Sequence, residues 1–144
     1  MPQVFDVIRA NIGSIVSIDI ADDNLDMKQA TDVVVNITAG SVAVRVRTER
    51  CKYRDWTVRS RSLYGGETEL SKLKKGFANW YLYAWSTAGV LSEWMLIDLD
   101  KVRSGGILDR PWSEIPNGDG TKFISIPRHV LGNCIVASNI ERAA

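Results

Sequence analysis

Histidine, cysteine and long apolar runs are scarce in this sequence of 144 residues. The lone His129 argues against a histidine-rich metal site and against a Ser-His-Asp triad. Cys51 and Cys134 lack C-x-x-C spacing, so we expect two reduced thiols rather than paired metal ligands. No apolar run approaches the roughly 18 residues of a membrane-spanning helix, so we expect no membrane partner.

Internal repeats, low-complexity tracts and linker-like segments are also absent from the sequence. The opening residues MPQVFDVIRA show no basic stretch followed by an apolar core, and we expect no signal peptide. Hydrophobic residues make up 45% and charged residues 24%, as in folded globular proteins. A chain of this length buries about two-thirds of its unfolded surface. We expect one domain over residues 1–144, located in the cytoplasm, or in the host-cell cytoplasm if the chain is viral.

Two segments carry helical patterns. Apolar residues recur at helical spacing over 3–12, and the pattern ends at Gly13. The segment 67–75 has acids in its first turn and lysines in its last, which complements a helix dipole. Gly76 then fits the left-handed position after a helix.

Runs rich in β-branched and aromatic residues predict the strands. They cover residues 31–38, 41–48, 56–62, 79–86 and 91–100, and the segment 117–126 fits a turn followed by a strand. Residues 14–21 alternate only loosely, and the end HVLGNCIVASN fits either a short helix or a last strand. We predict an α/β or α+β fold with a single mixed sheet of about five strands, an N-terminal helix and a helix after the third strand.

Charge is segregated along the chain, although the net charge is only +1. Basic residues outnumber acidic ones by seven to two between positions 45 and 61, whereas aspartates dominate positions 19 to 32. Such segregation indicates an anionic partner for the basic region. The seven basic residues are Arg45, Arg47, Arg50, Lys52, Arg54, Arg59 and Arg61.

Two of these arginines alternate with valines. Arg45 and Arg47 lie at period-two spacing among Val42, Val44 and Val46, so they share one face of the strand. Because the valines suit the buried face, we expect both arginines to point away from the main core.

The neighbouring elements add acids and further cations. Arg59 and Arg61 alternate on the next strand, and Asp32 opens the preceding one. Glu69 and Lys72 stand on the helix that follows. Carboxylates that hold Mg²⁺ or Mn²⁺, surrounded by cations that bind phosphates, suit metal-assisted phosphodiester cleavage.

The order of these elements, with Asp32 and the R-V-R at 45–47, resembles the PD-(D/E)xK nuclease superfamily over roughly residues 3–86. The resemblance implies a helix, a three-stranded meander, a helix and a fourth strand. It also implies an aspartate at the start of the second core strand, where Asp32 stands. An acid-x-Lys is implied on the next strand, where Arg45 and Arg47 stand instead. Arginine donates only and cannot ligate a metal.

Some members of the superfamily carry the missing acid on the following helix. The resemblance therefore implies Glu69 in that role, with Glu67 as the next choice. Asp6 on the first helix and Asp26 before the strand are further candidate carboxylates.

We therefore predict a metal-dependent endonuclease that acts on DNA, and the small size fits a viral or mobile-element origin. The metal is Mg²⁺ or Mn²⁺, held by Asp32 and Glu69. The catalytic set is Asp32, Glu69, Arg47 and Lys72, and the nucleic-acid contacts are Arg45, Arg59, Arg61, Arg50 and Lys52.

Two alternatives stay open beside the endonuclease, as does a homodimer. In the first, an inactive protein of the same fold uses its basic face to bind nucleic acid or an acidic protein. In the second, the domain is structural, and its arginines form a solvated sheet face. They then pair with Asp32, Glu49 and Asp55 across strands.

Two other motifs have plainer interpretations. The aromatic run at 79–86 contains Trp80, Tyr81, Tyr83 and Trp85, which suit base stacking if exposed. We expect these rings to pack in the core instead. The N-G-D-G at 117–120 lacks the further acids of a calcium loop, so we expect an ordinary turn.

Overall fold

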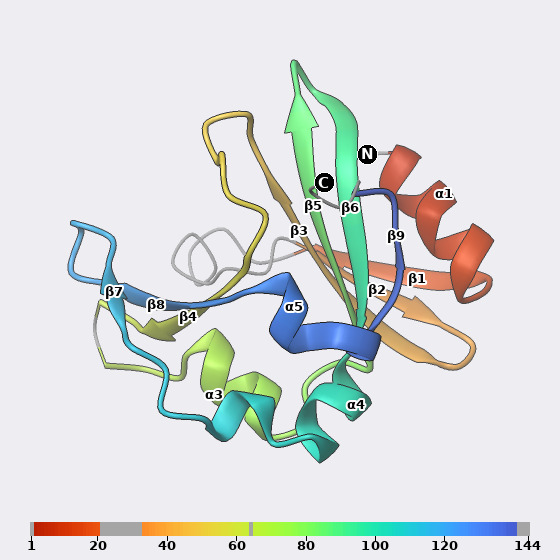
Figure 1. Ribbon diagram of the computed structural model, residues 1–144. Coiled ribbons are helices and arrows are strands. Elements are labelled where there is room, and N and C mark those ends of the chain that lie inside the picture. The colour runs from red at the N-terminus through yellow and green to blue at the C-terminus, as the bar shows by residue number, and fades with distance from the viewer. Residues whose placement is uncertain (1, 21–32, 64, 141–144) are drawn as a thin grey trace.

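The computed structural model describes residues 2–20, 33–63 and 65–140 (Figure 1). Its helices are α1 (Pro2–Asn11), α3 (Glu69–Lys74), α4 (Leu99–Ser104) and α5 (Arg128–Leu131), with short 3-10 turns η1 (Ile107–Asp109) and η2 (Gly132–Cys134). Its strands are β1 (Ile15–Ile20), β2 (Val33–Ile37), β3 (Gly40–Arg47), β4 (Trp56–Arg61), β5 (Trp80–Thr87), β6 (Val90–Asp98), β7 (Ile115–Pro116), β8 (Lys122–Ile126) and β9 (Ile135–Ser138).

The strands form two sheets. The larger has the order β1-β2-β3-β5-β6-β9, in which β1, β2 and β3 form an antiparallel meander and β5 runs parallel to β3. The smaller has the order β4-β8-β7. The mixed α+β architecture, the N-terminal helix and the helix before β5 are confirmed. The prediction of one sheet of about five strands agrees only roughly with the structure, which has a six-stranded sheet and a separate three-stranded sheet.

A second sheet forms because β4 pairs with β8 and not with β3. The apolar residues Trp56 and Val58 of β4 stand opposite Ile126 and Ile124 of β8 in antiparallel register. Apolar cross-strand pairs of this kind stabilise a sheet. All four side chains are buried, so β4 gains its partner from a strand far along the chain rather than from β3.

Each face of the larger sheet has its own core. On one face, Val4 and Ile8 of α1 pack against valines and leucines of β2, β3, β5 and β6. On the other face, the small sheet, α3 and α4 pack against aromatic residues of β5. Tyr81, Tyr83 and Trp85 are fully or almost fully buried there, so the prediction of core packing is confirmed for these three rings. Trp80 is half-buried and packs against the core on the other face.

Helix α3 begins where the sequence supplies a capping box. The Thr68 hydroxyl accepts from Ser71 N, and the Ser71 hydroxyl accepts from Thr68 N. At its other end, Arg103 of α4 donates to the carbonyls of Leu73, Phe77 and Ala78. The short helix is thereby held at both ends, which fixes the position of Glu69 in its first turn.

Gly40, at the start of β3, lies so close to the side chain of Asn79 that no other amino acid fits at this position. Its φ is +147°, and a Cβ atom there would overlap Asn79 Oδ1. That oxygen accepts from Ser41 N at 3.0 Å. We expect Gly40→Ala to lower the free energy of unfolding by about 2 kcal/mol, from backbone strain and the displaced hydrogen bond.

Urea unfolding followed by circular dichroism measures this loss. Gly66→Ala is the matched control, since its Cβ would meet nothing closer than Ser62 Oγ at 4.0 Å. Equal stability of the two variants would contradict the proposed role of Gly40.

Candidate functional site

A cavity of about 410 Å³ lies between the end of β3, the loop 48–55 and the small sheet. We call it the arginine cavity. Its lining comprises Arg45, Arg47, Cys51, Tyr53, Asp55, Thr57, Arg59, Ile115, Asn117, Phe123 and Ser125. Cations from both sheets therefore line one cavity.

Arg45 and Arg47 share one face of β3, as predicted, but they do not point away from the main core. They stand in register with Tyr83 and Trp85 of β5, on the face of the larger core. The expectation failed because β3 is an internal strand with both faces covered. Its valines pack under α1, and the opposite face turns towards the small sheet.

Arg47 reaches the floor of the arginine cavity. Its Nη1 donates to Thr57 Oγ1 at 3.2 Å and to the hydroxyl of Tyr83 at 3.4 Å. The Thr57 and Tyr83 hydroxyls are themselves 2.6 Å apart. Arg47 is half-buried, and its guanidinium group reaches the hydroxyl of the completely buried Tyr83.

Arg59 comes from β4, on the opposite wall. Burial lowers the pKa of its guanidinium group, and repulsion from Arg45 and, more weakly, Arg47 lowers it further. Asp119 and Glu69 oppose these effects. The charged form of Arg59 is thus disfavoured by its surroundings, and an anion bound in the cavity would relieve the repulsion.

The remaining lining residues divide by chemistry. Asp55 accepts from Ser125 Oγ at 3.1 Å, so the carboxylate has a protein partner. Tyr53 and Ile115 have exposed fractions of 79% and 41% and lie at the mouth. Phe123 alternates with buried neighbours on β8 and presents its ring to the cavity.

Glu69 lies beneath this region as a buried carboxylate with an exposed fraction of 2%. Its Oε2 accepts from the Tyr81 hydroxyl at 2.6 Å, and its Oε1 accepts from Arg59 N at 3.2 Å. Burial, and then the nearby Glu69 carboxylate, raise the pKa of Tyr81 well above its usual value. Glu69 therefore joins α3 to β4 and β5.

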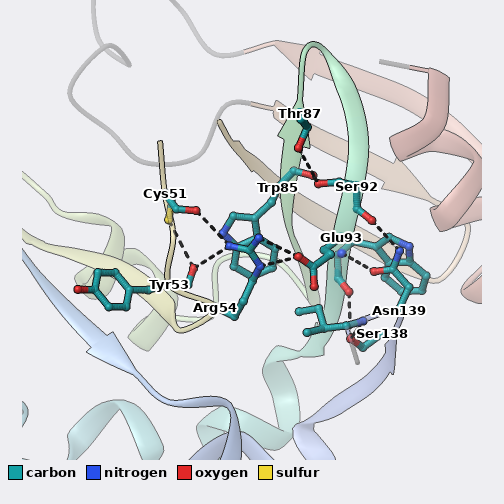
Figure 2. Close-up of polar contacts among 11 residues, drawn as sticks. Cys51, Tyr53, Arg54, Trp85, Thr87, Ser92, Glu93, Ser138 and Asn139 are labelled. Atoms are coloured by element: carbon teal, nitrogen blue, oxygen red, sulfur yellow. Dashed lines mark hydrogen bonds and ion pairs between the residues drawn. The ribbon is translucent and has the colours of Figure 1, made fainter. Parts of the chain in front are cut away.

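The loop 48–55, which forms one wall, is held by Arg54 (Figure 2). Arg54 Nε and Nη2 each lie 2.8 Å from Glu93 Oε1 on β6. Its Nη1 donates to Cys51 O at 3.1 Å, and its Cζ lies 4.8 Å from the centre of the Trp85 ring. Because Cys51 and Tyr53 line the cavity, this contact shapes its wall.

Several predicted cations lie outside the arginine cavity. Arg61 follows a register irregularity after Arg59, and its Nη2 lies 3.8 Å from Glu114 Oε2. Lys72 Nζ lies 5.7 Å from the centre of the Phe77 ring. Arg50 and Lys52 are exposed on the loop 48–55 and are not part of the cavity lining.

The predicted carboxylates are scattered or lie beyond the described residues. Asp32 and Asp26 fall outside the part of the chain that the structure describes. Asp6 is exposed on α1, which covers the opposite face of the larger sheet, and pairs with Arg9 at 3.4 Å. Glu67 pairs with Lys75 Nζ at 3.0 Å on the surface.

The described residues fit a divalent metal poorly. Within residues 2–20, 33–63 and 65–140, no group of three or more His, Cys, Asp or Glu side chains stands together as a metal cluster. Both oxygens of Glu69 accept from protein donors, and Arg59 lies within electrostatic reach of that carboxylate. A site rich in guanidinium groups repels a cation and attracts an anion.

Sequence reasoning missed the uncharged residues of the cavity. Thr57, Phe123 and Ser125 alternate with buried neighbours, and that periodicity shows that they share a face. It does not show that the face meets β3, since that depends on how β4 and β8 pack.

Comparison with known proteins finds no matching family model, curated protein or solved structure. Among the residues that the structure describes, no helix has the length and apolar character to cross a membrane.

Proposed function

We propose that the protein binds nucleic acid through the arginine cavity. The observation that carries this proposal is the convergence of Arg45, Arg47 and Arg59 from two sheets on one cavity. One carboxylate, Asp55, stands among the described lining residues, and it accepts from Ser125. The excess of positive charge favours an anionic ligand.

The guanidinium groups, and the hydroxyl groups and aromatic rings beside them, favour phosphate over carboxylate ligands. A guanidinium group forms paired hydrogen bonds to phosphate oxygens. Thr57 and Ser125 add hydroxyl groups, and Tyr53 and Phe123 add rings on which a base can stack. Phosphate beside an aromatic ring is the chemistry of a nucleotide.

Fluorescence anisotropy of labelled DNA oligonucleotides across a salt series tests this proposal. The logarithm of affinity is expected to fall against the logarithm of salt, with a slope of about −0.7 to −0.9 for each phosphate that the arginines neutralise. Affinity that does not change with salt would contradict the proposal. Equal binding of a poly-glutamate peptide would indicate an acidic protein partner instead.

Metal-dependent DNA cleavage is the second candidate. The order of elements in and beside the larger sheet favours it: α1, the meander β1-β2-β3, α3, and then β5 beside β3, with β4 of the smaller sheet inserted between β3 and α3. Apart from the inserted β4, this is the order that the PD-(D/E)xK resemblance implies. Asp32 directly precedes β2 in the sequence, and an acid at that point is the feature on which cleavage would depend.

A plasmid-nicking assay with and without Mn²⁺ tests this second candidate. If the protein cleaves DNA, we expect Asp32→Ala to abolish the Mn²⁺-dependent activity. Asp6→Ala, on the opposite face of the larger sheet, should retain it. Absence of nicking by the unaltered protein would contradict the cleavage proposal, and undiminished nicking by Asp32→Ala would remove Asp32 from the site.

A further inference from the structure

The size of the arginine cavity limits how much nucleic acid it takes. Its volume of about 410 Å³ is near the lower end of ligand pockets, which span about 300–1,000 Å³. Grooves that bind single strands along their length hold about 4–16 nucleotides. The cavity therefore suits a single nucleotide-sized group rather than a stretch of strand.

The burial of the lining side chains also decreases from the floor of the cavity to its mouth. Arg47 bonds to the buried hydroxyl of Tyr83, and Arg59 sits where burial disfavours its charge. Tyr53 and Ile115, in contrast, are exposed at 79% and 41%. The half-buried arginines thus lie farther from solvent than the side chains of Tyr53 and Ile115.

This gradient distinguishes two ways in which a nucleotide can enter. A nucleotide flipped out of a strand places its base deepest, while the phosphates on both sides stay at the mouth. A strand end that carries a phosphate can place that phosphate deepest and its base nearer the mouth. Only the second arrangement puts the negative charge against the deep guanidinium groups.

The number of cations and donors agrees with a terminal phosphate. A phosphomonoester carries about −1.5 to −2 charges near pH 7, whereas an internal phosphodiester carries about −1. Within the described residues, Arg47 donates through Nη1 alone, and a guanidinium group has five N–H donors. Hydrogen-bonding capacity therefore remains for phosphate oxygens.

We propose that the arginine cavity binds the phosphorylated end of a nucleic-acid strand, with the terminal phosphate against Arg45, Arg47 and Arg59 and the last base near Tyr53. This inference rests on the proposed function, because it specifies which part of a nucleic acid enters the same cavity. The ligand chemistry is a terminal phosphomonoester, from either the 5′ or the 3′ end.

Four single-stranded DNA probes of one sequence test the inference by competition: 5′-phosphorylated, 3′-phosphorylated, unphosphorylated, and closed into a circle. We expect one phosphorylated probe to bind at least about tenfold more tightly than the unphosphorylated one, and the circle to compete poorly. The preferred probe identifies the end. Thymidine monophosphate should also compete better than thymidine.

Arg47→Gln should remove the preference for the phosphorylated probe. Arg9→Gln, on α1 at the opposite face of the larger sheet, should leave it intact. Equal affinity for all four probes would overturn the inference while leaving nucleic-acid binding in place. No binding of any probe would overturn both proposals. The comparison of thymidine monophosphate with thymidine uses the unaltered protein, so it tests the inference even if Arg47→Gln folds poorly.

Discussion

Replacing Glu69 with alanine is expected to lower the free energy of unfolding by about 3 kcal/mol. The substitution leaves the buried Tyr81 hydroxyl and the backbone N–H of Arg59 without their carboxylate acceptor. An unsatisfied buried donor costs about 1–3 kcal/mol, and the vacated volume adds to the loss. Urea unfolding followed by tryptophan fluorescence measures the change.

Two further variants define the role of Glu69. Tyr81→Phe removes the hydroxyl donor but leaves the donor from the Arg59 backbone, and it should cost less, about 1–2 kcal/mol. Glu67→Ala removes an exposed acid two positions away, paired with Lys75, and should cost under about 0.5 kcal/mol. If Glu69→Ala were as stable as Glu67→Ala, the carboxylate would not be a structural acceptor, and a metal-binding role would gain support.

The second large effect concerns affinity. If the arginine cavity binds DNA as proposed, replacing Arg45, Arg47 and Arg59 together with glutamine is expected to weaken binding by about a hundredfold or more, since each substitution would remove a charge-assisted hydrogen bond to phosphate. The salt dependence should also flatten, by about one unit of slope for each phosphate that the variant no longer neutralises. Anisotropy titrations at two or more salt concentrations measure both changes.

A matched triple variant distinguishes the effect of the cavity arginines on DNA affinity from the effect of net charge. Arg9→Gln, Lys74→Gln and Arg110→Gln together remove the same number of charges from exposed positions outside the cavity. This control should bind almost as tightly as the unaltered protein. If both triple variants bound DNA equally, non-specific surface charge would account for binding, and the arginine cavity would not.

The cavity variant is expected to fold. Burial, and then repulsion from Arg45, lower the pKa of Arg59, so the loss of its charge is expected to cost little stability. Glutamine at position 47 keeps a donor near Thr57 and Tyr83. Circular dichroism of the variant checks this before affinities are compared.

Local patterns predicted most of the elements. The alternation around Arg45 and Arg47 indicated the correct strand and the correct shared face. The acids, lysines and glycine around α3 indicated the correct helix. Such features depend on neighbours a few residues away, and periodicity records them directly.

The packing of segments that are far apart in the chain could not be predicted from the sequence. The exit of β4 into a second sheet depends on pairing between Trp56 and Ile126, which are far apart in the chain. Because β4 belongs to the second sheet, the face of β3 that carries Arg45 and Arg47 lines a cavity and is not the outer surface that the sequence predicted. Glu69 resembled an exposed acid of a first helical turn, and only the packing of Tyr81 beneath it shows that it is buried.

The most direct measurement of the central claim is a nuclear magnetic resonance titration that follows the arginine Nε–Hε signals as a phosphorylated DNA oligonucleotide is added. We predict that the signals of Arg45, Arg47 and Arg59 shift together and saturate at one equivalent, while that of Arg9 stays unchanged. Shifts confined to arginines outside the cavity, or no shift in the three, would contradict binding there.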